Sequence, residues 1–349
     1  MRRARRRGLP LHCATDVKVL LPDTVFADDH ALEREAAGDI EVEVHHAATA
    51  AELERPALAA ADALVVQHRV TYDAGIAAAA ANCRILVRAG VGLDNVDIAA
   101  WSARNVPVCN VPDYGISEIA DHVLALILAL ARGLSTYHRR VEAAPNAPWL
   151  PFPLPPTVRR LKGSRLLILG LGAVGRAVAQ RALAHDMRVA YVDPQASEAA
   201  GLERMTDLDG ALADADVVSL HVPLTPATRH LIDAARIARM KPGALLINTA
   251  RGGIVAPRAL YDGLRSGRIG GAGLDVWEQE PPSADDPLFA ALAGDEDWLR
   301  GRLIVTPHVA SISAASIREM RQKSVATARD YLVSGVLRNC VNRAALKPR

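Results

Sequence analysis

The 349-residue sequence has little cysteine and no recognisable metal-binding pattern. Its four cysteines, Cys13, Cys83, Cys109 and Cys340, show no C-x-x-C spacing, and its 11 histidines include no H-E-x-x-H motif. A disulfide framework needs several regularly spaced cysteines, and a structural zinc site needs closely paired ligands. The sparse cysteines argue against both kinds of site, and they are typical of a protein of the reducing cytoplasm.

The chain also lacks a long hydrophobic run and a strong excess of charge. Its most apolar segment, residues 123–131, is much shorter than the ~20 residues that a membrane-spanning helix needs. A net charge of +2 gives no reason to expect a membrane or nucleic-acid partner. Residues 1–15 are the exception, because five of the six positions from 2 to 7 are arginine. These arginines could contact an anionic partner, but we interpret the segment as a disordered, non-essential basic leader. We do not interpret it as a secretory signal, because no apolar core of sufficient length follows it.

Short apolar runs alternate with helical patterns along the whole chain, which predicts an α/β fold with parallel sheets. The length suits two domains of ordinary size. Strands are expected at 17–21, 40–44, 63–66, 84–87 and 106–108 in the first part, and at 166–169, 189–192, 217–220, 244–247, 271–274 and 303–305 in the second.

The segment that follows the first group of strands predicts one long helix over 117–141. Residues 145–156 then contain six prolines, which exclude a helix or a central strand and indicate an extended arm. Apolar side chains between these prolines suggest that the arm lies against a surface such as a second subunit. A final helix at 312–332 is expected to return to the first domain.

A glycine motif follows the strand predicted at 166–169. The sequence LLILGLGAVG ends in G-x-G-x-x-G at residues 170–175. Gly170 would allow a tight turn, Gly172 would let the backbone approach a pyrophosphate, and Gly175 would let the next helix pack closely. The helix N-terminus adds free N–H groups and a partial positive charge. The motif predicts a dinucleotide site rather than a purely structural turn.

An acidic residue, Asp193, stands at the end of the next strand, 18 residues after the last glycine. Its carboxylate would accept hydrogen bonds from the adenosine ribose hydroxyls. It would also repel a 2′-phosphate, and Pro194 supplies no positive charge to offset that repulsion. The sequence therefore favours NAD over NADP as the cofactor.

Three polar segments follow later strands of the same predicted sheet, where an α/β protein places its ligands. Arg251 offers a rigid fork of donors for a carboxylate and a neighbouring carbonyl oxygen. His308 can exchange a proton near neutral pH, and Glu280 beside it would favour its protonated form and fix its tautomer. The trio suits hydride reduction of a 2-keto acid, although each residue alone could form an ordinary ion pair or strand cap. The segments are 248–253, 274–281 and 306–308.

Taken in order, these motifs resemble the D-isomer-specific 2-hydroxyacid dehydrogenase family over about residues 17–342. The sequence RAGVGLDNVD at 88–97 belongs to the same resemblance, and IREMR at 317–321 and NCVN at 339–342 point to its C-terminal binding protein branch. The resemblance implies two Rossmann-like or flavodoxin-like parallel-sheet domains. The NAD-binding domain, 115–311, would be inserted into a discontinuous substrate domain formed by 16–114 and 312–349.

The resemblance also implies residue roles. Arg251 would bind the substrate carboxylate and carbonyl, His308 would be the acid/base, Glu280 would be its partner, and Asp275 would hold the nicotinamide carboxamide. The implied NAD contacts are Gly170, Gly172, Ala173, Val174, Gly175, Asp193, His221, Val222, Pro223, Thr225, Thr249, Ala250, Arg251, Asp275, His308 and Ala310.

The loop after the strand at 84–87 is expected to contact the substrate from the first domain. Successive backbone N–H groups there can form an anion-binding nest for the carboxylate, as an alternative to a plain turn. Residues 67–69 follow another strand and could also face the substrate. The expected substrate-binding residues are Arg88, Gly90, Val91, Gly92 and Arg251.

Two positions depart from the C-terminal binding protein branch. Gly115 replaces a serine near the start of the long helix, and Ser311 replaces a tryptophan three residues after the catalytic histidine. The first departure removes one phosphate contact, and the second changes a position close to the cofactor.

The leading hypothesis is an NAD-dependent homodimeric oxidoreductase acting on a small D-2-hydroxy or 2-keto acid. An alternative is an NADH-responsive, peptide-binding protein of the co-repressor type, because that branch keeps the same three polar residues. A third is oxidation of a non-carbon anion such as phosphite. Formate is disfavoured, because it needs no acid/base pair.

Overall fold

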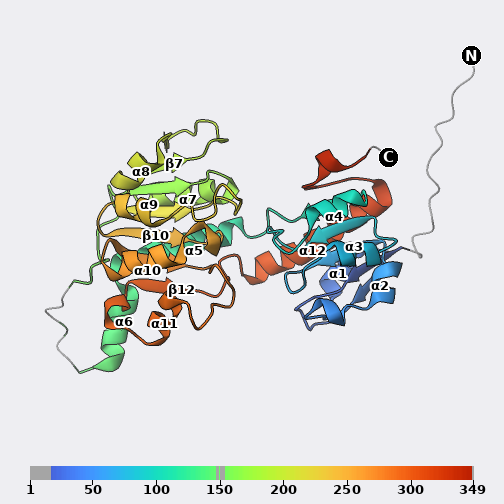
Figure 1. Cartoon of the computed structure of the whole chain (residues 1–349), viewed down its shortest axis with the longest axis horizontal. Helices are drawn as coiled ribbons and strands as arrows, with labels where there is room; N and C mark the ends of the chain where they lie inside the picture. Colours follow the sequence, from blue (N-terminus) through green and yellow to red (C-terminus); the bar gives the residue numbers. More distant parts are fainter. Residues whose placement is uncertain (1–16, 147–148, 150–153, 348–349) are drawn as a thin grey trace, which may run out of the picture. The chain divides into compact units, whose positions relative to one another are not determined.

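The computed structural model describes residues 17–146, 149 and 154–347, which form two compact units (Figure 1). Unit 1 comprises residues 1–114 and 313–349, and unit 2 comprises residues 115–312. Each is built around one parallel sheet, which confirms the predicted fold class. The basic leader, and residues 147–148 and 150–153 of the proline-rich arm, lie outside the described residues, so their roles stay predictions.

Unit 1 holds a five-stranded sheet whose strands all run parallel. The strand order is β2 (Glu41–Val44), β1 (Lys18–Leu21), β3 (Ala63–Val66), β4 (Ile85–Arg88) and β5 (Val108–Asn110). Its helices are α1 (Ala31–Ala37), α2 (Arg55–Ala60), α3 (Ala74–Ala79), α4 (Ile98–Ala103) and α12 (Ala314–Ser334).

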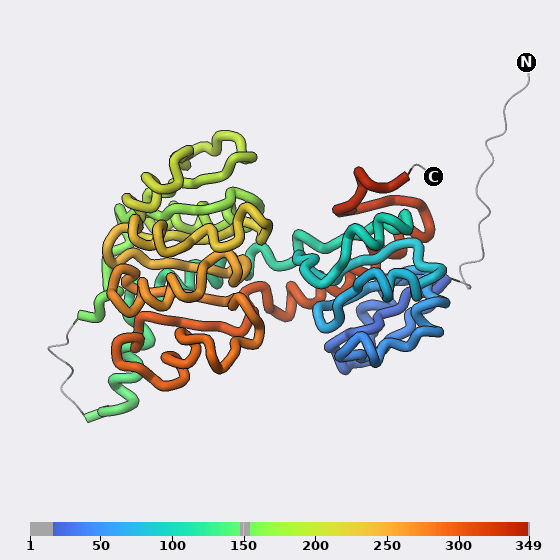
Figure 2. The backbone as a smooth tube through the Cα atoms, in the orientation of Figure 1, coloured from blue at the N-terminus to red at the C-terminus, as the bar shows by residue number. Residues whose placement is uncertain are grey.

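Alternate residues of the unit 1 strands face opposite sides of the sheet, and each side carries its own helices. Leu20 of β1 packs in the core shared with α2, α3 and α4, whereas Val19 and Leu21 pack on the side of α1 and α12. Both faces are therefore apolar, as expected for a buried parallel sheet. Figure 2 shows the consequence for the chain path, because the red C-terminal helix lies among the blue N-terminal elements.

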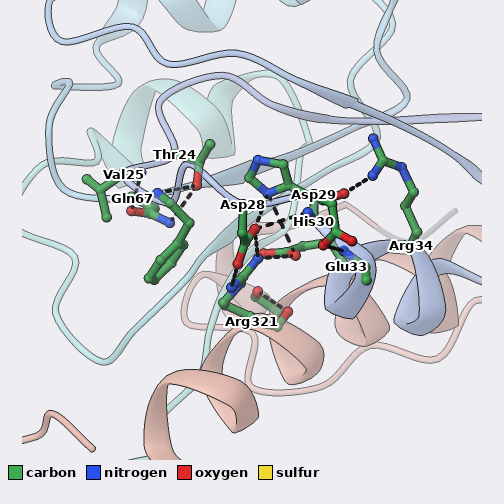
Figure 3. Close-up of polar contacts among 12 residues, drawn as sticks. Thr24, Val25, Asp28, Asp29, His30, Glu33, Arg34, Gln67 and Arg321 are labelled. Atoms are coloured by element: carbon green, nitrogen blue, oxygen red, sulfur yellow. Dashed lines mark hydrogen bonds and ion pairs between the residues drawn. The ribbon is translucent and has the colours of Figure 1, made fainter. Parts of the chain in front are cut away.

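A buried ion-pair cluster fixes α12 to the start of the chain (Figure 3). The Arg321 guanidinium donates to both carboxylate oxygens of Glu33, at 2.6 and 2.7 Å, and to both of Asp28, at 2.6 and 2.8 Å. It also lies 4.4 Å from the centroid of the Phe26 ring. The side chain is only 5% exposed, so its charge depends on these partners.

Unit 2 holds a seven-stranded sheet that is also fully parallel. The strand order is β12 (Leu303–Val305), β11 (Ile269–Leu274), β10 (Ala244–Asn248), β9 (Val217–Leu220), β6 (Arg165–Leu169), β7 (Arg188–Val192) and β8 (Glu203–Arg204). Helices α5 (Ile116–Arg132) and α7 (Ala173–Ala184) cover one face. The other face is covered by α8 (Leu208–Asp214), α9 (Ala234–Arg239), α10 (Pro257–Arg265) and α11 (Pro287–Ala293).

The apolar runs predicted the strands to within two residues at each end, except for β8, which is exposed and has no apolar run. The single helix predicted over 117–141 is wrong. The structure divides it into α5 and α6 (Leu134–Ala143) at Gly133, whose φ of 63° is left-handed. A β-carbon there would lie 2.9 Å from Val158, so the break is built into the packing.

The last helix begins at Ala314 rather than at 312, because Ser313 caps it. The Ser313 hydroxyl accepts from the Ser316 N–H at 2.9 Å, and Ser316 returns a bond to the Ser313 backbone. Among the described residues no single helix is long and apolar enough to cross a membrane, although α5 and α6 together, bent by 58°, reach that length and composition.

Candidate active site

The predicted cofactor and catalytic residues of unit 2 follow six neighbouring strands of one sheet. The loops after β12, β11, β10, β9, β6 and β7 emerge at the same edge, since all these strands are parallel. Backbone hydrogen bonds connect adjacent loops, because Asp275 N–H donates to Asn248 O at 2.9 Å and His308 N–H donates to Asp275 O at 2.8 Å. The sheet edge therefore brings together residues that are far apart in the sequence.

The glycine loop between β6 and α7 has the geometry that a close turn requires. Gly170 adopts φ 94°, and a β-carbon there would lie 2.7 Å from His221 O. A β-carbon at Gly175 would collide with Gly170 O, so only glycine lets α7 approach the turn. Gly172 caps the N-terminus of α7 and has open space where a side chain would be. An anionic group could thus reach the first N–H groups of α7, at Ala173 and Val174.

Asp193 at the end of β7 is tied to this glycine loop. Its carboxylate accepts from the N–H groups of Leu171 at 2.8 Å, Gln195 at 2.7 Å and Ala196 at 3.0 Å. Partial burial opposes its ionisation, but the hydrogen bonds outweigh that effect and lower the pKa of Asp193 below its usual value. A fixed negative charge therefore lies beside the turn, as discrimination against a 2′-phosphate requires.

The loop after β9 lies against the same turn. His221 N–H donates to Leu169 O at 2.7 Å, and its Nε2 lies 2.8 Å from the Ser219 hydroxyl. Burial lowers the pKa of His221 to about 4, so the ring is neutral near neutral pH. A β-carbon at Gly170 would also lie 3.0 Å from Val222. Pro223 and Thr225 continue this loop, and Thr225 forms a turn through the Thr228 hydroxyl at 2.8 Å.

The loop after β10 is shaped by the side chain of Asn248. Its Oδ1 accepts from Ala250 N–H at 3.1 Å, and its Nδ2 donates to Arg251 O at 2.9 Å. Gly252 has no room for a β-carbon because the Trp277 backbone occupies that space, so Arg251 is held beside the loop that carries Glu280. The Thr249 hydroxyl is buried without a hydrogen-bond partner among the described residues. Such an orphaned polar atom fits a site completed by a ligand.

Glu280 and His308 form a direct pair. The Glu280 Oε2 atom lies 2.6 Å from His308 Nδ1, and Oε1 accepts from Trp277 N–H at 2.9 Å. Partial burial alone would raise the pKa of Glu280, but the bonds from His308 and Trp277 and the charge of Arg251 lower it. The carboxylate thus fixes Nδ1 as its partner, and Nε2 is the ring nitrogen that can exchange a proton with a ligand. Half of the His308 side chain is exposed.

Asp275 organises the loop that carries His308. Its side chain is almost fully buried, and Oδ1 accepts from the Thr306 hydroxyl at 2.6 Å and from Val309 N–H at 2.9 Å. Its Oδ2 accepts from Ala310 N–H at 2.9 Å. The predicted contact of Asp275 with the nicotinamide carboxamide stays a prediction. Thr306 and His122 of α5 were not among the predicted site residues. The His122 Nε2 atom lies 3.0 Å from the Thr306 hydroxyl.

The predicted substrate loop of unit 1 is a turn after β4. Gly90 adopts φ 142°, with the Arg88 guanidinium occupying the space of a β-carbon. Its carbonyl accepts from Val111 N–H at 3.0 Å, and Val91 O accepts from the Asn110 amide at 2.8 Å. Substrate binding by Arg88, Gly90, Val91 and Gly92 stays a prediction.

Gln67, which was expected to be able to face the substrate, also has a structural role. It is buried, and its amide connects the end of β3 to the segment after β1 through Thr24 and Val25, both at 3.2 Å (Figure 3). Its backbone N–H also donates to Asp23 at 2.8 Å. His68 and Arg69 are exposed, and their part in substrate binding stays a prediction.

The two departures from the C-terminal binding protein pattern lie in contact. A β-carbon at Gly115 would lie 2.8 Å from the Ser311 β-carbon and 3.2 Å from its carbonyl oxygen. Serine at position 115 would therefore not fit beside residue 311 as the backbone is arranged here.

Comparisons with known proteins show which proteins the chain is similar to. Residues 124–310, more than half of the chain, match the model for the D-isomer specific 2-hydroxyacid dehydrogenase NAD-binding domain. The chain is 34% identical over 340 residues to D-3-phosphoglycerate dehydrogenase from Archaeoglobus fulgidus, covering 95% of this chain and 60% of that protein. It is 36% identical over 264 residues to hydroxypyruvate reductase from Thermotoga maritima, covering 74% and 81%.

A solved structure gives the same result. The D-lactate dehydrogenase of Aquifex aeolicus, complexed with NAD and lactic acid, matches with a TM-score of 0.80 at 25% identity, covering 95% of this chain and 100% of that chain. The chain spans about three fifths of the length of the phosphoglycerate dehydrogenase relative. These three proteins are named as dehydrogenases or a reductase, and the finer resemblance to the C-terminal binding protein branch stays a prediction.

Proposed function

Because the chain belongs to the D-isomer specific 2-hydroxyacid dehydrogenase family, we propose that it interconverts a D-2-hydroxy acid and its 2-keto acid with NAD. The observation that carries this proposal is the 2.6 Å pair of Glu280 and His308 beside Arg251, on the sheet that also holds the glycine loop. A dinucleotide site alone fits many reactions. An acid/base pair and an arginine that can bind a carboxylate at the same edge favour a 2-keto acid as the substrate.

The residues of unit 2 would divide the work as follows. NADH, when bound, would supply the hydride for C2 of the keto acid. Arg251 binds the substrate carboxylate and the carbonyl oxygen and orients C2. His308 gives its Nε2 proton to that oxygen, and Glu280 stabilises the imidazolium before the transfer. In the reverse direction His308 accepts the hydroxyl proton, so atoms and charge balance both ways.

NAD would be held by groups that the fold already positions. The first N–H groups of α7 would bind the pyrophosphate, and Asp193 would bind the ribose hydroxyls. The buried Thr249 hydroxyl lacks a partner among the described residues and would gain one at this edge. Asp193 supports NAD over NADP as the preferred cofactor, because it would face the additional phosphate of NADP.

Several finer points are part of the same proposal. The substrate is a small 2-keto or 2-hydroxy acid, and the protein works as a cytoplasmic homodimer. Phosphite oxidation and peptide binding of the C-terminal binding protein kind are the alternatives. The Glu280–His308 pair can protonate the carbonyl oxygen of a keto acid, and in phosphite oxidation it would instead take a proton from the attacking water.

The test is NADH oxidation with glyoxylate, hydroxypyruvate, pyruvate and bulkier 2-keto acids. We expect turnover of at least one, and a loss of about 10²- to 10⁴-fold in His308→Ala with NADH binding retained. His138→Ala is the matched control, because His138 lies exposed on α6 beside Glu142. Unchanged turnover in His308→Ala would contradict the assignment. Peptide binding without turnover in the wild type would favour the co-repressor alternative.

A further inference from the structure

Three side chains connect helix α5 with the loop that carries His308. The His122 Nε2 atom lies 3.0 Å from the Thr306 hydroxyl, and that hydroxyl donates to Asp275 Oδ1 at 2.6 Å. The His122 ring nitrogen is itself 3.9 Å from the same carboxylate oxygen. Helix, strand end and loop of unit 2 thus meet in one short hydrogen-bonded series.

The direction of these bonds follows from counting protons. A threonine hydroxyl has one proton, and Thr306 gives it to Asp275. The Thr306 oxygen must therefore accept, and His122 must present Nε2–H to it. The reverse arrangement would withdraw the Thr306 proton from a carboxylate that is almost fully buried, leaving one of its hydrogen bonds unmade. His122 thus acts as a donor at the end of the series.

We propose that His122 is a positioning residue for the loop from Thr306 to Ala310, acting through Thr306 and Asp275. The effect on turnover rests on the proposed function, because it matters only if His308 is the acid/base. Asp275 receives the N–H groups of Val309 and Ala310 on its carboxylate and the N–H of His308 on its carbonyl. Fixing the Asp275 side chain therefore fixes the backbone on both sides of the catalytic ring.

The packing of α5 explains why His122 can reach this loop. Strand β11 contains Gly271 and Gly273, and a β-carbon at Gly273 would lie 3.0 Å from the β-carbon of Leu126. The glycines thus let α5 pack directly on the sheet. His122 lies one helical turn before Leu126, and Asp275 lies two residues beyond Gly273 toward the strand end. The close helix–strand contact therefore sets the reach of the imidazole.

The backbone conformation of His308 has to be held in place by neighbouring hydrogen bonds. This residue adopts φ 56°, a left-handed conformation that is unfavourable for a residue with a side chain. Residues in such conformations persist when the surrounding bonds hold them in place. The bonds from Asp275 to the N–H groups of residues 308, 309 and 310 do this, and the His122–Thr306 contact keeps the carboxylate from rotating away.

The test compares four single variants. His122→Phe removes the donor and keeps a ring, Thr306→Val removes the hydroxyl at equal size, and His122→Gln places an amide N–H donor near the original Nε2 position. His138→Phe is the matched control on the exposed face of α6. The two readouts are kcat and KM for a 2-keto acid that the wild type reduces, and amide hydrogen exchange of the peptide that contains Thr306 to Ala310.

We expect His122→Phe and Thr306→Val each to lower kcat by about tenfold or more with a smaller change in KM. Exchange of the loop amides should rise by about tenfold, the change for one hydrogen bond of ordinary strength. His122→Gln should restore both, and His138→Phe should change neither. The double variant His122→Phe/Thr306→Val should have the same kcat and the same loop exchange as either single variant. Each single change already breaks the connection from His122 through Thr306 to Asp275.

Wild-type kcat and loop exchange in His122→Phe would overturn the proposal, as would additive effects in the double variant or failure of His122→Gln to rescue. If His122→Phe does not fold, the same outcomes apply to Thr306→Val. If the wild type reduces no 2-keto acid, the proposed function fails. Hydrogen exchange then still decides whether His122 holds the loop.

Discussion

Two groups of ionisable side chains have almost the same shortest distance and opposite surroundings. In unit 1, Arg321 lies 2.6 Å from Glu33, and their side chains are 5% and 2% exposed. In unit 2, His308 lies 2.6 Å from Glu280, and their side chains are 50% and 37% exposed. The Arg321 cluster also directs donors at Asp28, whereas the His308 pair commits Nδ1 and leaves Nε2 for a ligand. Distance alone therefore does not distinguish a structural pair from a catalytic one.

The difference in burial predicts different energetics for the two groups. Removing one partner from a buried pair leaves an uncompensated charge and costs much of the stability of the protein. An exposed pair contributes little to stability, because water screens it and replaces the lost partner. We therefore expect the Arg321 cluster to control unfolding and the His308 pair to control turnover.

Replacing Arg321 should have the largest effect on stability. Arg321→Met keeps much of the apolar stem but leaves the Glu33 carboxylate buried without its cation. We expect the free energy of unfolding to fall by about 3–5 kcal/mol, measured by denaturant titration. Asp28→Asn is the control, because half of the Asp28 side chain is exposed, and it should cost about 1 kcal/mol or less.

If Arg321→Met unfolded at the same denaturant concentration as the wild type, the buried Arg321 cluster would not control the stability of the protein. The expectation would also be wrong if Asp28→Asn were as destabilising as Arg321→Met. In the second case the number of ion pairs, and not their burial, would determine the contribution to stability.

Replacing Glu280 should lower turnover and leave stability almost unchanged. Glu280→Gln keeps the size of the side chain but cannot stabilise an imidazolium at Nδ1 of His308. We expect turnover to fall by about 10²-fold or more, while the free energy of unfolding changes by less than about 1 kcal/mol. Parallel kinetic and denaturation measurements check this. A loss of stability as large as that in Arg321→Met, with turnover intact, would reverse the roles assigned to the two groups.

His221 provides a third case, because it belongs to unit 2 but its side chain is buried, like that of Arg321. Its pKa of about 4 lies below the ordinary value of 6.5. As the pH falls below 6.5 the unfolded chain gains a proton on this ring and the folded protein does not, so stability falls until about pH 4. We expect a loss of about 1.5 kcal/mol between pH 6.5 and 5 from this group.

The measurement is the free energy of unfolding at several pH values in the wild type and in His221→Gln, which keeps a polar partner for Ser219. The difference between the two curves isolates the histidine from the carboxylates, whose protonation also reduces stability at low pH. Curves that run parallel from pH 6.5 to 5 would show that His221 is not protected from protonation.

Much of the fold was predictable, because a buried strand needs an apolar run and each short run predicted as a strand became one. The strand β8 was not, since Glu203 and Arg204 are exposed and carry no hydrophobic signal. The break at Gly133 was not either. The apolar period continues on both sides of this glycine. The lack of space for a β-carbon beside Val158 is known only from the folded chain.

The candidate site shows a similar division. Arg251, Glu280 and His308 were predicted because each follows an apolar strand and the chain resembles a known family, and Asp193 was predicted by its distance from the glycines. The role proposed for Thr306 and His122 was not predicted, since it depends on a contact between residues 184 positions apart. One signal was available, because His122 interrupts the apolar face of an otherwise hydrophobic helix. Its partner could not be named without the close packing of α5 on Gly273.

The Arg321 cluster has a consequence for the order in which the protein is made. Its acidic members leave the ribosome before unit 2, residues 115–312, whereas Arg321 follows only after all of unit 2 has been synthesised. Unit 2 is continuous in sequence and can complete its sheet as it emerges. Unit 1 has to keep Glu33 hydrated and its α12-facing sheet surface uncovered until the last helix arrives. We therefore expect the first part of the chain to be the one that chaperones protect during translation, although it is synthesised first.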